Sequence, residues 1–232
     1  MEAIILAGGR GTRLRSIISD VPKPMAPING TPFLEIILDL LISNGFKRVI
    51  LSVGYKSENI IKHFGSNYKN LKLHYSIENK PLGTGGAIKQ SIKMAKSKKV
   101  FILNGDTCLD VDHRTLLNKF KKTNNPIIVV KKVDDISRYG EVIFKNDVIK
   151  SFKPKMGANK SGYINTGCYI FPISLFDGLN TFFDKFSLEE EFFPYAIESK
   201  NITLNAFVCN NSFIDIGIPS DFNKAQNFFD EK

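Results

Sequence analysis

The chain has 232 residues and a mass of 26.1 kDa, with 43% hydrophobic residues and a mean hydropathy of -0.10. These values predict a globular protein of one large domain or two small ones, and no apolar run approaches the ~20 residues of a membrane-spanning helix. The net charge of +9 would suit nucleic acid, but the lysines are scattered and no basic run alternates with aromatic residues. We therefore expect solvated faces, with neither nucleic acid nor a membrane as partner.

In the first half of the chain, strand-like and helix-like segments alternate. The expected strands are 3–6, 48–53, 71–77 and 99–103, and the expected helices are 32–44, 57–63 and 84–95. Ser57 is a candidate helix cap, and Gly45 and Gly65 are candidate helix stops. Alternation with short connections predicts a mostly parallel sheet that helices cover on both faces. Ligands of such sheets bind beyond the carboxyl ends of the strands.

Beyond residue 110 the strand-like runs become shorter. The expected strands are 126–132, 139–144, 148–152, 163–171 and 202–208, and the expected helices are 113–122, 188–199 and 219–230. They predict either a second portion of sheet or a subdomain packed on the first. Because no linker or repeat separates the two parts, we expect one domain over residues 1–232, with lobes over about residues 1–110 and 111–232.

The cysteines and the start of the chain indicate a reducing compartment. Cys108, Cys168 and Cys209 are widely spaced and odd in number, which predicts buried thiols in place of disulfides or a metal motif. The chain enters a strand-like segment without the basic stretch and cleavage site of a signal peptide. We therefore expect a cytoplasmic protein.

A glycine-rich loop at 8–11 follows the first strand-like run. Its bare backbone N–H groups can approach phosphate oxygens closely, although such a loop also fits a simple turn. Thr12 adds a hydroxyl group and Arg13 a permanent, forked cation. Lys23 lies between two prolines that restrict the local backbone. Together these residues predict a site for the triphosphate of a nucleotide.

Two acidic residues follow strand-like runs. Asp106 ends an Asn-Gly-Asp string after 99–103, and Asp215 precedes the last expected helix. A carboxylate at the carboxyl end of a strand commonly holds Mg²⁺ against phosphates. A turn at Asp106 and a helix entry at Asp215 are the alternatives.

The string Gly-Gly-x-Gly-Thr-Arg-Leu at 8–14, followed by Pro-Lys-Pro-Met at 22–25, resembles the signature of the sugar-1-phosphate nucleotidyltransferases. The resemblance covers nearly the whole chain and implies a Rossmann-like α/β fold, in which helices flank a mostly parallel mixed sheet and a smaller β-rich lobe binds the sugar. It implies Arg13, Lys23 and Asp106 as catalytic residues. It also implies Asp106 and Asp215 as ligands of a catalytic Mg²⁺ cofactor.

The segment 78–87 is similar to the family's Leu-Gly-Thr-x-Gly-Ala segment, which lies against the base and the ribose. The glycines at the start of this helix predict close packing and free N–H groups. Glu78 can accept hydrogen bonds from N1–H and N2–H₂ of guanine, and a surface salt bridge is the alternative. The expected nucleotide-binding residues are Leu6, Ala7, Gly8, Gly9, Gly11, Thr12, Arg13, Glu78, Gly83 and Thr84.

Three shorter segments resemble the family's sugar site: Tyr-Gly-x-Val at 139–142, Asn-x-Gly at 165–167, and Phe-x-Glu-Lys at 152–155, where Pro154 replaces the glutamate. Lys155 matches the lysine that meets the sugar phosphate, with Lys153 as the alternative. The segment 187–189 fits a helix cap as well as a site. The expected residues that bind the sugar phosphate are Gly140, Lys155, Tyr163 and Asn165.

The resemblance implies an enzyme whose substrates are a nucleoside triphosphate and a sugar 1-phosphate. The sugar phosphate attacks the α-phosphorus in line and pyrophosphate leaves, so no general base is needed. The short chain is most similar to D-glycero-α-D-manno-heptose 1-phosphate guanylyltransferases, which use GTP and form GDP-heptose for surface glycans such as capsule or lipopolysaccharide. Mannose-1-phosphate guanylyltransferases and muramyl-phosphate uridylyltransferases are the next most similar classes and remain alternatives.

Two other classes of protein stay open. A non-catalytic nucleotide-sugar sensor would typically lack one of the charged residues Arg13, Lys23, Asp106 and Asp215, all of which are present. A basic RNA-binding protein would show an RNA affinity that falls steeply with salt. A homodimer also stays open.

Overall fold

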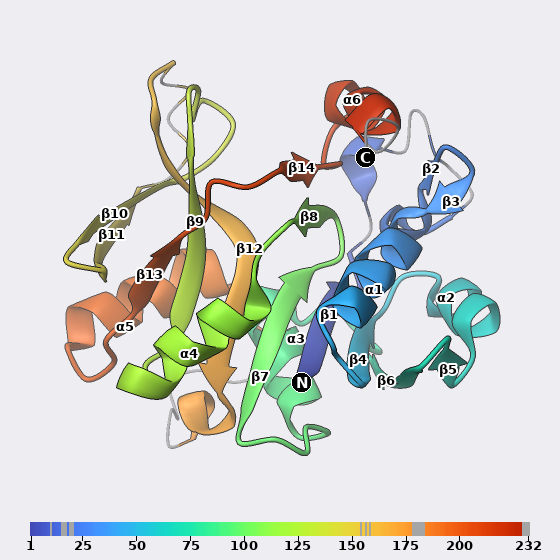
Figure 1. Ribbon diagram of the computed structural model, residues 1–232, viewed down its shortest axis with the longest axis horizontal. Coiled ribbons are helices and arrows are strands. Elements are labelled where there is room, and N and C mark those ends of the chain that lie inside the picture. Colours follow the sequence, from blue (N-terminus) through green and yellow to red (C-terminus); the bar gives the residue numbers. More distant parts are fainter. Residues whose placement is uncertain are drawn as a thin grey trace.

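A ten-stranded mixed sheet runs through the protein, of which the computed structural model describes residues 1–9, 11–14, 18, 21–153, 155, 157, 159–177 and 184–228. Its strands are β1 (Glu2–Ala7), β4 (Arg48–Val53), β5 (Asn67–Tyr68), β6 (Leu71–Ile77), β7 (Lys99–Asn104), β9 (Ile127–Val133), β10 (Glu141–Lys145), β11 (Val148–Lys153), β12 (Gly162–Pro172) and β13 (Asn205–Val208). They are ordered β10-β11-β13-β9-β12-β7-β1-β4-β6-β5 (Figure 1). Two small sheets pair β2 (Pro27–Ile28) with β3 (Thr31–Pro32) and β8 (Thr107–Leu109) with β14 (Phe213–Asp215).

The parallel block β7-β1-β4-β6 confirms the parallel sheet predicted for the first half. Ile5 pairs in register with Leu51 on one side and with Leu103 on the other. β12 then joins β7 in the antiparallel direction and continues the sheet toward β9. Of the two arrangements predicted beyond residue 110, the structure therefore has the second portion of the same sheet. We propose on this ground that the chain is a single domain with two lobes.

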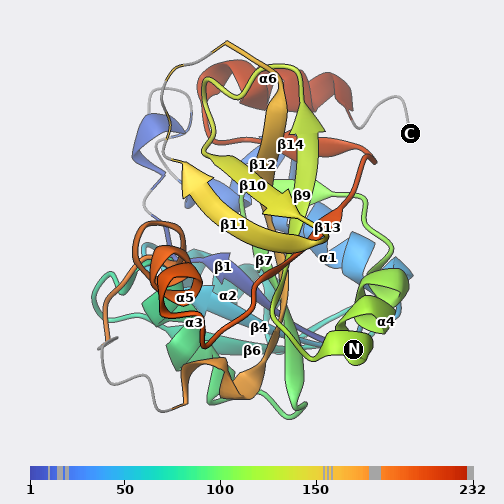
Figure 2. The ribbon, with the colours of Figure 1, turned by 90° about the vertical axis from the view of Figure 1, so that its left-hand side faces the viewer.

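Helices cover both faces of this sheet. They are α1 (Phe33–Ser43), α2 (Ser57–Phe64), α3 (Gly83–Ile92), α4 (His113–Thr123), α5 (Phe193–Ser199) and α6 (Pro219–Phe228). Figure 2 shows α1 and α4 on one side of the sheet and α3 and α5 on the other. This arrangement confirms the predicted α/β fold with a mixed sheet between helices. No helix among the described residues is long and apolar enough to cross a membrane.

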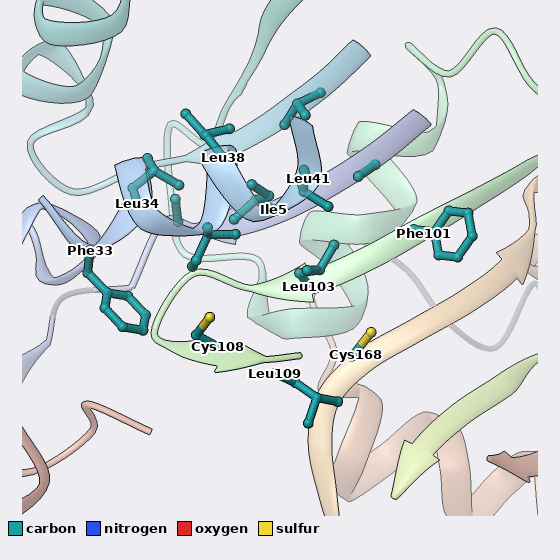
Figure 3. Close-up of a cluster of buried hydrophobic side chains, with 14 of the residues drawn as sticks. Ile5, Phe33, Leu34, Leu38, Leu41, Phe101, Leu103, Cys108, Leu109 and Cys168 are labelled. Carbon is teal, nitrogen blue, oxygen red and sulfur yellow. The ribbon is translucent and has the colours of Figure 1, made fainter. Parts of the chain in front are cut away.

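Each face of the sheet has its own buried cluster. On one face, Leu34, Leu38 and Leu41 of α1 pack toward Ile5 and Leu103 of the sheet (Figure 3). Their spacing of three and four residues forms the apolar stripe that predicted this helix. The other cluster lies on the opposite face, where α3 and α5 pack against the sheet. The three cysteines are free and buried, as predicted.

Several predicted helix and strand boundaries are wrong, each for a local reason. Ser57 is not a cap: it is the first residue of α2, and Lys56 precedes it with a φ of 52° and no capping side chain. The helix expected over 188–199 is divided into a π-helical turn, Leu188–Phe192, and α5. Ser187 caps this turn, because its hydroxyl accepts from Glu190 N at 3.2 Å. The strand expected over 202–208 begins only at Asn205.

His113, at the start of α4, is fully buried and lies edge-on to Phe46 and Phe101 with ring centroids 5.0 and 5.3 Å away. Burial lowers the pKa of His113 from 6.5 to about 4. The folded protein therefore disfavours the imidazolium, whereas the unfolded chain binds its proton at the ordinary pKa.

We expect His113 to make the protein less stable in acid. Its contribution is full above the unfolded pKa of 6.5 and is lost as the pH falls toward 4, by about 2 kcal/mol between pH 7 and pH 5. Urea unfolding of the wild type and of His113→Leu at the two pH values measures this. The variant should lose correspondingly less stability than the wild type, and an equal loss in both proteins would contradict the expectation.

Candidate active site

The parallel strands end at one edge of the sheet, and the loops that follow them meet there. Gly105, after β7, donates its backbone N–H to Leu6 O of β1 at 2.9 Å, and Glu78, after β6, donates to Val53 O of β4 at 2.8 Å. A Cβ at Gly105 would lie 2.6 Å from Leu6 O, so the approach of these two backbones requires glycine. The loops after β1, β6 and β7 thus form one continuous surface.

A cavity of 360 Å³ lies against this surface. It is bounded by the glycine loop after β1, by the segment after β6 and by the start of α3. Lys23, Asn104 and Asp106 close its other side. The predicted nucleotide-binding residues that line it are Leu6, Gly8, Gly9, Glu78, Gly83 and Thr84.

A larger cavity of 770 Å³ adjoins the first, and Asn104 and Asp106 line both. It lies between the end of β7 and the second lobe, and it has both carboxylates and cations in its wall. The predicted site residues that line it are Arg13, Asp106, Gly140, Lys155, Asn165 and Asp215. The predicted nucleotide and sugar sites are therefore neighbouring cavities joined at Asp106.

Asp106 and Asp215 are brought together by the pairing of β8 with β14. Asp215 pairs with Thr107, and Ile216 N donates to Asp106 O at 3.0 Å. Burial raises the pKa of Asp215 and the charge of Asp106 raises it further, while Lys23 opposes both effects. Lys23 itself forms an ion pair with Asp106, and its side chain is only 9% exposed. The carboxylate pair is thus neutralised in part by one nearly buried ammonium group.

This pair of carboxylates fits a divalent metal that is shared with a substrate. Within the described residues, no group of three or more His, Cys, Asp and Glu side chains could hold a metal ion by itself. Mg²⁺ is usually bound by one or two carboxylates together with substrate phosphates and water. Two adjacent carboxylates in a cavity wall therefore suit a metal that arrives with a nucleotide.

Glu78 is half-buried and comes directly after β6. Its carboxylate accepts from Leu82 N at 3.1 Å and from Ser52 Oγ at 3.3 Å. Burial raises the pKa of Glu78, and these two hydrogen bonds oppose the rise. Among the described residues it forms no ion pair. The cavity position thus favours the acceptor interpretation over the surface salt bridge.

The glycines at the start of α3 serve packing and do not present free N–H groups. Gly85 N and Gly86 N donate to Phe186 O at 3.0 and 3.3 Å. A Cβ at Gly83 would lie 2.4 Å from the same oxygen, and Gly83 has a φ of +72°. The expectation of close packing is confirmed, whereas the expectation of free N–H groups is wrong for Gly85 and Gly86, whose N–H groups are bound by Phe186 O.

Some predicted site residues do not line either cavity. Ala7 is buried in the core, and Tyr163 packs edge-on against Phe144 at 4.9 Å. Gly11 has a φ of +58° and lies against Lys23, since a Cβ there would be 2.8 Å from Lys23 Cβ. Thr12 is exposed and begins the 3₁₀ turn Thr12–Leu14. Pro154 lies outside the described residues, so the replacement at that position has no structural account.

Lys155 and Lys153 both line the larger cavity but differ in their partners. Lys153 Nζ lies 4.0 Å from Glu141 Oε2, whereas Lys155 has no ion pair among the residues that the structure describes. This difference favours Lys155 over its alternative as the cation that is available to a ligand.

The residues of the larger cavity outside the expected binding set include Glu189 and Tyr139. Glu189 lies in the π-helical turn, and Tyr139 precedes Gly140. Burial raises the pKa of Tyr139 to about 12, so its hydroxyl keeps its proton at neutral pH. The segment 187–189 fitted a helix cap as well as a site, and the long separation from α3 gave no signal that Glu189 reaches the nucleotide segment.

Comparisons with known proteins find relatives over nearly the whole length of the chain. A family model described as nucleotidyl transferase matches residues 2–232. D-glycero-α-D-manno-heptose 1-phosphate guanylyltransferases from Campylobacter jejuni and Aneurinibacillus thermoaerophilus are 44% and 42% identical, covering 96% and 97% of this chain and 97% of each relative. The crystal structure of HddC from Yersinia pseudotuberculosis, complexed with GMP-PN, superposes with a TM-score of 0.87 and 38% identity over 98% of this chain and 99% of that chain.

Proposed function

The chain belongs to the nucleotidyl transferase family, and we propose that it transfers GMP from GTP to D-glycero-α-D-manno-heptose 1-phosphate. Pyrophosphate leaves and GDP-heptose forms. The observation that carries this proposal is the pair of cavities joined at Asn104 and Asp106, one lined by the glycine loop and Glu78 and the other by Lys155 and Asn165. Heptose as the sugar is supported by relatives that are similar over nearly their whole length.

In this proposal the nucleotide lies in the smaller cavity. The backbone of Gly8 and Gly9 approaches the triphosphate, because a Cβ at Gly9 would meet nothing within 4 Å and the space is open. Gly11 and Thr12 complete the turn that holds Arg13 at the larger cavity. Guanine donates N1–H and N2–H₂ toward the Glu78 carboxylate, whereas adenine lacks this pair of donors and would leave the acceptor unpaired.

The sugar 1-phosphate occupies the larger cavity with its phosphate directed toward Asp106. Lys155 neutralises the phosphate and Asn165 donates to it, while Gly140 lines the cavity and lies against the end of β11, where a Cβ would be 2.8 Å from Lys153 O. The attacking phosphate oxygen is already anionic, so the residues need not remove a proton from it. Arg13 and Lys23 stabilise the charge that builds up on the transferred phosphoryl group. Asp106 and Asp215 would hold Mg²⁺, which would supply further neutralisation and hold the phosphates in line.

Lys23 must change partners during this reaction. In the free protein its ammonium group pairs with Asp106. To contact the triphosphate it has to turn away from that carboxylate, which leaves Asp106 available as a metal ligand. The same short displacement would therefore serve both the phosphate and the metal.

An assay of pyrophosphate release across GTP, ATP, UTP and CTP, each with a panel of sugar 1-phosphates, tests the proposal. GTP with the heptose 1-phosphate should give the highest kcat/KM. Preferred use of another nucleotide would contradict the guanine assignment. Equal rates with mannose 1-phosphate would contradict only the heptose assignment, and no turnover in any combination would favour the sensor. The cytoplasmic location, the link to surface glycans and the homodimer stay predictions.

A further inference from the structure

We propose that Glu189 is a positioning residue that couples the two substrate sites, so that a bound nucleotide and a bound sugar phosphate each raise the affinity for the other. The inference rests on the proposed function, because it assigns one cavity to each substrate. It is carried by a hydrogen-bond chain that begins beside the nucleotide cavity and ends at Asn165 in the sugar cavity.

The Glu189 carboxylate lies at the centre of this hydrogen-bond chain and is held by three hydroxyl groups. Thr84 Oγ1 donates to Oε2 at 2.7 Å, and Ser187 Oγ lies 3.2 Å from the same oxygen. Tyr169 Oη donates to Oε1 at 3.2 Å. Among the described residues no lysine or arginine forms an ion pair with Glu189. A carboxylate without a cation depends on these donors for its stabilisation in the site.

The direction of each hydrogen bond follows from the available protons. A carboxylate only accepts, so Thr84 and Tyr169 give it their single hydroxyl protons. Thr84 Oγ1 is then left to accept from Leu188 N at 2.9 Å, and Tyr169 Oη to accept from Asn165 Nδ2 at 2.8 Å. Gly167 N donates to Asn165 Oδ1 at 3.0 Å. The amide group of Asn165 is therefore held in one orientation, with one of its two N–H donors bound to Tyr169 and the other left for a ligand.

The nucleotide end of this hydrogen-bond chain packs against the residues just before the turn that carries Glu189. Phe186 N donates to Leu82 O at 3.0 Å, and Phe186 O accepts from Gly85 and Gly86. The residues around Gly83 and Thr84 thus cannot move without the turn that carries Glu189. A nucleotide that packs against Gly83 and Thr84 would restrict this turn as well.

The sugar end of the hydrogen-bond chain is held by the packing of Tyr169. Tyr169 is fully buried in β12, four positions from Asn165 on the same strand, and its ring lies 5.9 Å from that of Phe193 at the start of α5. Its hydroxyl would still accept from Asn165 if Glu189 were lost, but its proton would lose the acceptor that it has in this buried position. Because both arms share the Glu189 carboxylate, a substrate that selects one arrangement of its own arm selects the matching arrangement of the other, which is the origin of the positive coupling.

Calorimetric titration of α,β-methylene-GTP with Mg²⁺, in the presence and absence of saturating heptose 1-phosphate, tests the inference, because this analogue binds without transferring GMP. In the wild type the sugar phosphate should tighten nucleotide binding at least about fivefold. Glu189→Gln places an amide N–H₂ against Thr84 or Tyr169, so the factor should fall to about one while each ligand alone still binds. Tyr169→Phe keeps the buried ring and cuts only the sugar arm, and it should give the same result.

Glu198→Gln is the matched control, since Glu198 is an exposed residue of α5 outside the chain of hydrogen bonds. It should keep the wild-type factor. A factor of one in the wild type, or an unchanged factor in both Glu189→Gln and Tyr169→Phe, would overturn the inference and leave the proposed function standing. Failure of the wild type to bind the GTP analogue and the heptose phosphate would overturn both. If Glu189→Gln does not fold, Tyr169→Phe alone decides.

Discussion

Replacement of Asp106 by asparagine should lower kcat at least roughly a hundredfold, which corresponds to about 2.7 kcal/mol of activation free energy. Asparagine keeps the shape of the side chain but removes the charge that pairs with Lys23 and that would hold the metal. Asp106 is also the carboxylate that lines both cavities, so no other described acidic residue can take over its position. Pyrophosphate release at saturating GTP, heptose 1-phosphate and Mg²⁺ measures the effect.

Asp134→Asn is the control for this loss of one negative charge, because Asp134 is exposed and lines neither cavity. It should retain the wild-type kcat. A near-normal, magnesium-dependent rate in Asp106→Asn would remove Asp106 from the catalytic site.

Lys23→Met should lower kcat by a comparable factor, at least about a hundredfold, with a much smaller change in the KM for GTP. Methionine keeps an unbranched stem of similar length in this nearly buried position and removes only the ammonium group. If Lys23 neutralises charge that develops during transfer, its removal weakens the transition state more than the bound substrate. Steady-state kinetics over a range of GTP concentrations separate the two effects.

Lys62 is an exposed residue of α2 that lines neither cavity. Lys62→Met therefore provides the matched loss of one positive charge. Its kinetic constants should equal those of the wild type. A rise in KM with unchanged kcat in Lys23→Met would mean that Lys23 binds ground state and transition state equally, and the catalytic role would be wrong.

The positions of functional residues were easiest to predict from the sequence where those residues directly follow a strand. Asp106 and Glu78 each follow a strand-like segment, and parallel strands carry such residues to one edge. The segment bounds 48–53 and 71–77 agree with β4 and β6, the first a mostly apolar run and the second an alternating one. The second portion of the sheet was ambiguous, since nothing local tells an antiparallel continuation from a separate sheet.

Contacts between distant segments could not be predicted in the same way. Thr84 and Glu189 are 105 positions apart, and a single glutamate after a serine is typical of any helix entry. The glycines at 83–86 were correctly expected to allow close approach, but what approaches them is Phe186 and not a bound phosphate. Tyr163 lies two positions from Asn165 on β12 and so shares its side of the strand, yet it packs edge-on against Phe144 and does not line the cavity, a contact that the spacing alone did not show.

The most direct test of the proposed function is a competition in which the protein receives equal concentrations of GTP, ATP, UTP and CTP together with equal concentrations of heptose 1-phosphate and mannose 1-phosphate. The initial product ratio, measured by mass spectrometry, equals the ratio of the kcat/KM values. We expect GDP-heptose to be the predominant product, with equimolar pyrophosphate. A predominance of any product with another base, or of GDP-mannose, would contradict the proposed substrate pair.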